Sequence, residues 1–408
     1  MTTNALRAAA VKITVVGSEV DTSYFSDISP WKMSDEVIEV VEDNEHLGQI
    51  VSGKSQEQKN VDLRISKARN CLFGLLGASF AFKCFLSPVL KLHIFRTYIS
   101  PIMCSGLSSF ALQNTQLEPL ELFERKLLKS ILKLSSTAPT TAIHFLTGEL
   151  PVEGKIHKDV FSNFYSIWNN PDTKIHELIK YLLRTSSDNS RTWAILLRHL
   201  CNRYGLEDPL VYMNGDPPAQ SAWKELVNTK ITAYHEQKLR AAAAKNRRMN
   251  FLNTYSCNLK GRHHPALSNM VTTWDVKRSR AHIKFLSYEV KAEQGGGSPL
   301  CKICQTGSVE RISHIIASCP AMAKERDKVL LELRNLCTLT KNNLSLDYFI
   351  HNEDVLSQFI LDPTSLNLSI RVSLQDPIVS AFYRLSRDIC FILGKTRLKL
   401  LDEFSGKK

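Results

Sequence analysis

Apolar residues recur with the 3.6-residue period of an α-helix through most of this chain, and no other feature constrains its fold as much. From Val61 onward the apolar stripes are long, and proline or short polar runs separate them. Because each stripe needs a partner surface to bury it, we expect packed helices. The predicted helices cover 62–78, 88–101, 117–134, 155–169, 174–185, 190–204, 221–249, 320–337 and 376–401, and 273–290 forms either a helix or a pair of strands.

Local signals place several of the element boundaries. Ser87 followed by Pro88 is typical of a helix start, since serine caps the first turn and proline is tolerated there. Pro101 is expected to end or kink the helix that follows, because it lacks a backbone N–H. Short strands are predicted at 11–15 and 38–41 from their β-branched residues.

Two stretches predict breaks between domains. Residues 215–218 (GDPP) indicate a stiff turn or linker, and residues 294–299 (QGGGSP) indicate a flexible joint. We therefore divide the chain into residues 1–60, 61–214, 215–293 and 294–408. The predicted fold class is mainly α, with a short N-terminal β segment and a small C-terminal module.

The composition excludes several classes of protein. With 43% hydrophobic and 23% charged residues the chain is typical of a folded protein rather than a disordered one. The uncharged apolar stretch 71–82 is too short to span a bilayer, and the first twenty residues contain no secretory apolar run. We expect an intracellular protein, in the cytoplasm or nucleus, with no membrane partner. Seven of the ten cysteines stand alone, which favours buried thiols over disulfides.

The other three cysteines belong to a candidate metal site. Residues 301–319 read CKICQTGSVERISHIIASC, with Cys301, Cys304, His314 and Cys319 in the order C-x2-C-x9-H-x4-C. Sulfur and imidazole nitrogen are the ligands that zinc prefers, and four protein ligands leave no position open for chemistry. The spacing therefore predicts a structural zinc site rather than a catalytic one. Three chance cysteines and an unrelated helix histidine are the alternative.

Further metal or catalytic centres are not indicated. His263-His264 follows Cys257, but no fourth ligand is obvious, so we interpret this segment as a loop. Nucleotidyl transfer needs convergent carboxylates to hold metal ions, and the chain contains no Asp-Asp pair. Glu42, Asp43 and Glu45 are expected to lie in a solvated turn. We interpret His144 and His157 as packing or surface residues, because no partner nucleophile stands near them.

The positive charge of the chain is concentrated in one segment. The net charge is +12, and residues 238–284 contain eleven Lys/Arg and one acidic residue, Asp275. A solvated helix face is the usual explanation of such a run, but here the balancing acids are missing. Contact with a polyanion, RNA or DNA, is the favoured interpretation.

Four stretches of the sequence, taken in order, resemble the end of a non-LTR (LINE-type) retrotransposon reverse transcriptase. They are HLGQIVSG (46–53), VDLRISKARNCLFGLLG (61–77), LHIFRTYISPIMCSGL (92–107) and LELFERKLLKSILKL (120–134), and the last three are similar to the helical thumb of that family. The cysteine–histidine set at 301–319 matches the motif with which the family often ends. The resemblance extends from about residue 11 to about residue 319.

The resemblance implies a role for each predicted segment. Residues 1–60 would be the remnant of a polymerase palm, 61–214 the thumb and connector, 215–293 a nucleic-acid-contacting segment, and 294–408 a CCHC zinc module. The catalytic Asp-Asp motif of the family precedes the H-L-G element, and residues 1–45 contain no such motif. We therefore expect a truncated, non-catalytic protein without catalytic magnesium, which retains a structural zinc knuckle.

Such a protein would hold the backbone of RNA or DNA without regard to sequence. The predicted phosphate contacts are Arg64, Lys67, Arg69, Lys238, Arg240, Lys245, Arg247, Arg248, Lys260, Arg262, Lys277, Arg278, Arg280 and Lys284. The alternative is a host-used helical adaptor whose zinc module binds a protein and no nucleic acid. The sequence identifies no protein partner for either hypothesis.

Overall fold

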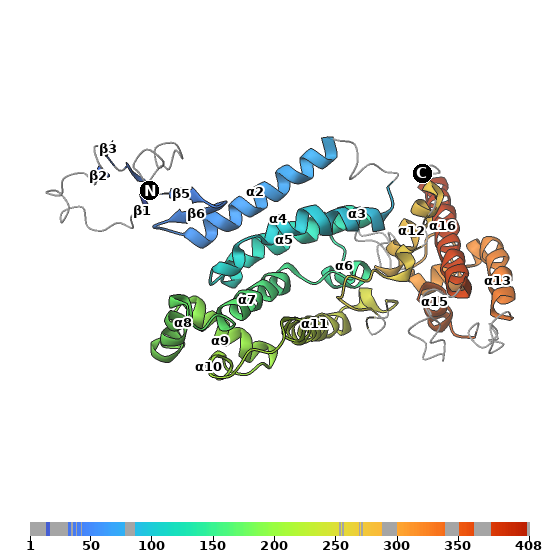
Figure 1. Cartoon of the computed structure of the whole chain (residues 1–408). Helices are drawn as coiled ribbons and strands as arrows, with labels where there is room; N and C mark the ends of the chain where they lie inside the picture. The colour runs from blue at the N-terminus through green and yellow to red at the C-terminus, as the bar shows by residue number, and fades with distance from the viewer. Residues whose placement is uncertain are drawn as a thin grey trace.

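The structure is a computed structural model of the chain, and it describes most residues from 43 onward together with four short strands before them. The described residues are 14–16, 32–33, 36–37, 39–41, 43–77, 86–252, 254, 257–268, 270, 272–287, 300–338, 351–362 and 377–405. Helices dominate, as the apolar periodicity predicts (Figure 1). Among these residues no helix combines the length and the apolar character needed to cross a membrane.

The strands form three small pairs at the N-terminal end. β1 (Thr14–Val16) runs parallel to β4 (Glu39–Val41), and β2 (Lys32–Met33) pairs with β3 (Glu36–Val37). β1 and β4 overlap the strands predicted at 11–15 and 38–41, although residues 11–13 and 38 lie outside the described residues, whereas β2 and β3 were not predicted.

A β-hairpin that the sequence analysis missed follows these strands. It joins β5 (Asp43–His46) to β6 (Gln49–Ser52). Leu47 and Gly48 both have positive φ, 48° and 78°, as a two-residue turn that matches the twist of the strands requires. The hairpin lies against the next helix, because Arg64 donates to the Gly48 carbonyl at 2.8 Å and Asn60 bonds both backbone groups of Ile50.

The first long helices pack against one another beside this hairpin. α2 (Gln56–Gly77) begins six residues before the prediction, and α5 (Asn114–Leu132) matches the predicted helix at 117–134 closely. Between them, Ser87 caps α3 (Pro88–Ile94) by accepting from the Leu90 N–H at 3.2 Å, so the predicted start is confirmed.

Pro101 does not end the helix that α3 begins, and this part of the prediction was wrong. The chain passes through a π-helical turn, Phe95–Ile99, and continues as α4 (Ser100–Cys104), with Pro101 in its first turn. The extra residue in the π turn shifts the hydrogen-bond pattern, so the N–H that proline lacks falls where a helix start leaves N–H groups free anyway.

The middle of the chain forms a second helical layer. It consists of α6 (Thr140–Thr147), α7 (Val152–Trp168), α8 (Lys174–Thr185), α9 (Trp193–Tyr204), α10 (Pro209–Met213) and α11 (Gln220–Ala244). α6 and α10 were not predicted, and α11 ends before the predicted limit of 249. The linker at 215–218 lies on α7: Trp168 donates to the Gly215 carbonyl at 2.9 Å, and Tyr165 to the Pro218 carbonyl at 2.7 Å. A domain boundary there stays a prediction.

The C-terminal helices gather at the opposite end from the strands (Figure 1). They are α12 (Thr273–Leu286), α13 (Ala323–Thr338), α15 (Glu353–Leu361) and α16 (Pro377–Ser405), of which only α15 was not predicted. Asp362 links them, since its carboxylate bonds His264 Nε2 at 3.3 Å and the Tyr383 hydroxyl at 3.2 Å. The predicted joint at 294–299 lies outside the described residues.

The loop before α12 is attached to the end of α6. Gly261 donates to the Gly148 carbonyl and His264 to the Leu146 carbonyl, both at 2.9 Å. Gly148 has a φ of +70°, and a Cβ there would lie 2.2 Å from the Arg262 carbonyl oxygen. Only glycine fits this close approach, which joins the middle layer to the C-terminal helices.

Candidate metal centre and an adjacent basic groove

The predicted zinc ligands come together in the structure. One ligand atom from each of Cys301, Cys304, His314 and Cys319 lies within 4.8 Å of all the others. A tight loop brings the first two cysteines into place: the Cys301 N–H donates to the Ser308 carbonyl at 2.8 Å, and Gln305 and Gly307 both have positive φ. We call residues 300–319 the knuckle.

The histidine begins a short π-helical turn, His314–Ser318, and the last cysteine directly follows that turn. The Cys319 N–H bonds the His314 carbonyl at 2.7 Å, which carries the last thiol back toward the first two. His314 Nε2 lies 3.4 Å from Cys304 Sγ, while its Nδ1 lies 3.1 Å from the Ser318 hydroxyl. Nε2 is therefore the ligand atom, and Ser318 orients the ring as outer partners of metal-bound histidines do.

The four side chains fit a closed zinc site. Three thiols and one imidazole nitrogen are the donor set of structural zinc sites, and Cys301, His314 and Cys319 are buried. Burial raises the pKa of Cys319 to about 12, whereas at Cys304 burial is outweighed by hydrogen bonds from Thr306 and His314, which lower the pKa to about 6. A zinc ion would hold all three sulfurs as thiolates.

The knuckle is anchored to the C-terminal helices. Arg326 of α13 donates to the Cys319 carbonyl at 3.2 Å, and the buried Arg397 of α16 donates from Nε to Glu310 at 3.0 Å. Loss of the metal would therefore affect the packing of this whole end of the molecule.

Arg280 interacts with other groups of the protein, and six more of the fourteen predicted phosphate contacts are bonded within it. Their partners are the Gly48 carbonyl for Arg64, Glu45 for Lys67, Glu153 for Lys238, Glu236 for Arg240, the Thr137 carbonyl for Arg248 and Asp388 for Arg278. Arg280 is only partly exposed, and its Nε is buried. These seven side chains stabilise the fold or are partly covered, so they are less available to a ligand than their charge suggests.

The other seven predicted cations are exposed, and none of them forms an ion pair with the described residues. They are Arg69, Lys245, Arg247, Lys260, Arg262, Lys277 and Lys284. Arg311 shares these properties, although the sequence analysis did not single it out. Its position inside the metal-binding spacer was the only signal that could have found it.

A groove of about 500 Å³ joins two of these cations. Arg247 and Phe251 line it from the end of the α11 segment, Arg311 lines it from the knuckle, and Asp354 and Gln358 line it from α15. Gln358 holds the walls together by donating to the Phe251 carbonyl at 3.0 Å. The basic segment and the knuckle, which are separate in the sequence, thus share one cavity with two guanidinium groups that the described residues leave unpaired.

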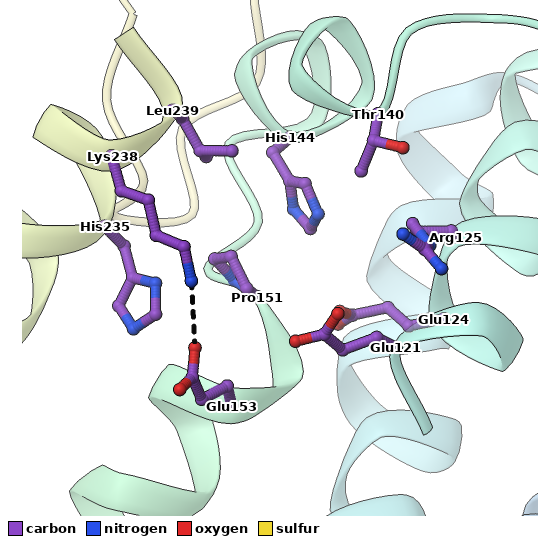
Figure 2. Close-up of a pocket in the computed structure, with 10 residues that line it drawn as sticks. All are labelled: Glu121, Glu124, Arg125, Thr140, His144, Pro151, Glu153, His235, Lys238 and Leu239. Atoms are coloured by element: carbon purple, nitrogen blue, oxygen red, sulfur yellow. Dashed lines mark ion pairs between the residues drawn. The ribbon is translucent and has the colours of Figure 1, made fainter. Parts of the chain in front are cut away.

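A second, smaller cavity of about 100 Å³ lies where α5, α6, α7 and α11 meet (Figure 2). Glu121, Glu153, His144 and His235 point toward it, and Lys238 reaches across to Glu153 at 3.5 Å. Burial and the nearby Glu153 raise the pKa of Glu121, and burial lowers the pKa of His235 to about 4. His144 lines this cavity, and His144 and His157 are both buried, in agreement with their interpretation as packing residues.

The His and Glu side chains around this cavity are not close enough together to hold one metal ion. Among the described residues, the knuckle is the only group of three or more His, Cys, Asp or Glu side chains close enough to hold one ion. The acids near the hairpin are exposed: Asp43 pairs with Lys59 and Glu45 with Lys67, each at 2.6 Å, while Glu42 lies outside the described residues.

Comparisons with known proteins identify no relative of the chain. No protein family, no curated protein and no solved structure matches it. The resemblance to LINE-type reverse transcriptases therefore stays a prediction from the four motifs, and the function must be argued from the site itself.

Proposed function

We propose that the chain binds the backbone of RNA or DNA, without catalysis, on a surface formed by its basic segment and the metal-bound knuckle. The observation that carries this proposal is the shared groove, where Arg247 and Arg311 converge from segments 64 residues apart in the sequence. Neither guanidinium has a partner among the described residues. Guanidinium groups suit phosphate oxygens, because their planar N–H groups can donate to two oxygens at once.

The metal would act in this function by holding structure. A closed Cys3His site fixes the loop that carries Arg311, and the contacts of Gln358 fix the facing wall. Lys245, Lys260 and Arg262 are exposed on neighbouring parts of the chain and would extend the positive surface beyond the groove. Binding of this kind depends on salt and is largely indifferent to base sequence.

The test is a titration of RNA and DNA oligonucleotides against the metal-loaded full chain at several salt concentrations. Each phosphate contact contributes about 0.7–0.9 to the slope of log affinity against log salt. The double variant Arg247→Ala/Arg311→Ala should therefore flatten the slope by about 1.4–1.8 and weaken binding. The matched control is Arg184→Ala/Arg191→Ala, which removes two exposed arginines from the α8–α9 region. Equal slopes for the two double variants would remove the groove from the proposal.

A protein-interaction adaptor is the second candidate, and one observation favours it. Ile175, Leu178 and Tyr181 of α8 and Val211 of α10 are each more than half exposed. Apolar clusters of this kind often mark protein contacts. An adaptor without nucleic-acid affinity would show no binding to either oligonucleotide at low salt, so the same titration separates the two candidates.

A further inference from the structure

One tryptophan stands apart from the others in the described chain. Trp168, Trp193 and Trp223 each donate their indole N–H to a backbone carbonyl, as tryptophans in a protein interior usually do. Trp274, in the first turn of α12, is 55% exposed, and its N–H has no partner among the described residues. The exposed indole offers a flat apolar surface, with that N–H at its edge, on which a ligand can stack.

The position of the Trp274 ring is held from two sides. Lys277 Nζ lies 4.7 Å from the ring centroid, and Phe391 of α16 meets the ring edge-to-face at 6.1 Å. The helix start beneath it is also fixed, because Thr272 and Asp275 cap each other's backbone N–H groups at 2.8 and 3.1 Å. The indole is therefore oriented before any ligand arrives, which lowers the entropy cost of binding to it.

The same helix face carries positive charge that forms no ion pair with the described residues. Trp274, Lys277, Ala281 and Lys284 follow one another at intervals of three, four and three residues, so they lie in one stripe along α12. Lys277 and Lys284 are exposed, and the two are separated by about 10 Å along the helix axis. The acids nearby are engaged, since Asp388 pairs with Arg278 at 2.9 Å and Asp275 serves as a cap.

We propose that this stripe binds single-stranded nucleic acid, with an unpaired base stacked on Trp274 and the adjacent phosphates held by Lys277 and Lys284. The inference rests on the proposed function and adds to it a preference for single strands. A base stacks on an aromatic ring whatever its identity, but in a duplex both faces of the base are already covered. The lysines complement the phosphates of such a strand, whereas a protein partner for the indole alone would give them no role.

The test compares an unstructured RNA oligonucleotide with a duplex of the same length, using fluorescence anisotropy and the metal-loaded full chain at one salt concentration. Trp274→Ala should weaken binding of the single strand by about 5- to 150-fold and change duplex binding less than about twofold. The variant Trp274→Phe keeps a smaller aromatic ring, so its affinity for the single strand should lie between the affinities of the wild type and of Trp274→Ala. The matched control is Tyr181→Ala, which removes another exposed aromatic ring, 62% exposed, from α8.

The possible results distinguish the stacking platform on Trp274 from the proposed function as a whole. Unchanged single-strand binding by Trp274→Ala, or an equal loss with single strand and duplex, overturns the stacking platform. If Arg247→Ala/Arg311→Ala still weakens binding in that case, the proposed function stands without the platform. If the wild-type chain binds neither oligonucleotide, both proposals fail. Trp274→Phe guards against a folding defect, because it keeps the packing against Phe391.

Discussion

Mild acid should destabilise the middle helical layer, because histidines are buried there in their neutral form, His157 and His235 among them. His157 Nδ1 lies 2.6 Å from the Tyr204 hydroxyl, which in turn lies 3.4 Å from His235 Nε2. The two imidazoles are 5% and 1% exposed. Burial lowers the pKa of each to about 4, and Arg203 and Lys238 act in the same direction while Glu153 opposes it.

The sign and size of the effect follow from these pKa values. An unfolded histidine has a pKa of about 6.5, so between pH 6.5 and 4 the unfolded chain binds more protons than the folded one. The free energy of unfolding must therefore fall as the pH falls through this window. At pH 5 each histidine costs about 2 kcal/mol relative to neutral pH, and the pair about 4 kcal/mol.

Urea unfolding at pH 7, 6 and 5, followed by tryptophan fluorescence, measures this loss. Trp168 and Trp223 lie 5.6 Å apart in the same core and report on its unfolding. His157→Gln should reduce the loss at pH 5 by about 2 kcal/mol, because one titrating group is gone. His199→Gln, at an exposed position, is the matched control. Equal unfolding free energies at pH 7 and pH 5 would refute the assignment of neutral buried imidazoles.

Two further predictions concern the metal centre and a buried ion network. Elemental analysis of the full chain, purified without chelator, should find one zinc ion per molecule. The variant Cys304→Ser should lose this ion, and the control variant Cys71→Ser should keep it. A metal-free wild-type chain would contradict the prediction. Lys155→Met should cost about 3–5 kcal/mol in urea unfolding, because it leaves two buried carboxylates, Glu124 at 2.9 Å and Glu149 at 3.0 Å, without this partner. A cost below about 1 kcal/mol would argue against the network.

Features that depend on neighbours in the sequence were predictable. Amphipathic helices such as α5 and the capped start at Ser87 follow from local periodicity and capping chemistry. The cluster of Cys301, Cys304, His314 and Cys319 was also predictable, since all four lie within 19 residues and their spacing suits one tetrahedral ion.

Features that depend on burial from all sides were not predictable. Residues 141–150, which include most of α6, are all buried, so no polar face remains to show a helical period. α15 is short, and five of its nine residues are buried. The hairpin at 43–52 gave a weak signal, because its turn places Leu47 rather than asparagine or aspartate before Gly48.

The sequence also could not show which positively charged side chains are paired within the fold. Charge alone could not separate Arg247, which is unpaired, from Arg248, which donates to a carbonyl 111 residues away. Arg278 is likewise paired with an acid from a distant helix. Only the tertiary structure shows which cations remain for a ligand, and only it brings Arg311 beside the basic segment.

Photocrosslinking tests most directly whether the knuckle and the basic segment form one nucleic-acid-binding surface. A thiouridine-containing RNA would be crosslinked to the metal-loaded full chain, and the attached peptides mapped by mass spectrometry. We predict crosslinks in both 245–251 and 309–313, the two segments that contribute basic residues to the lining of the groove. Crosslinks found only elsewhere on the chain, or bound RNA that reaches just one of these segments, would contradict the shared surface.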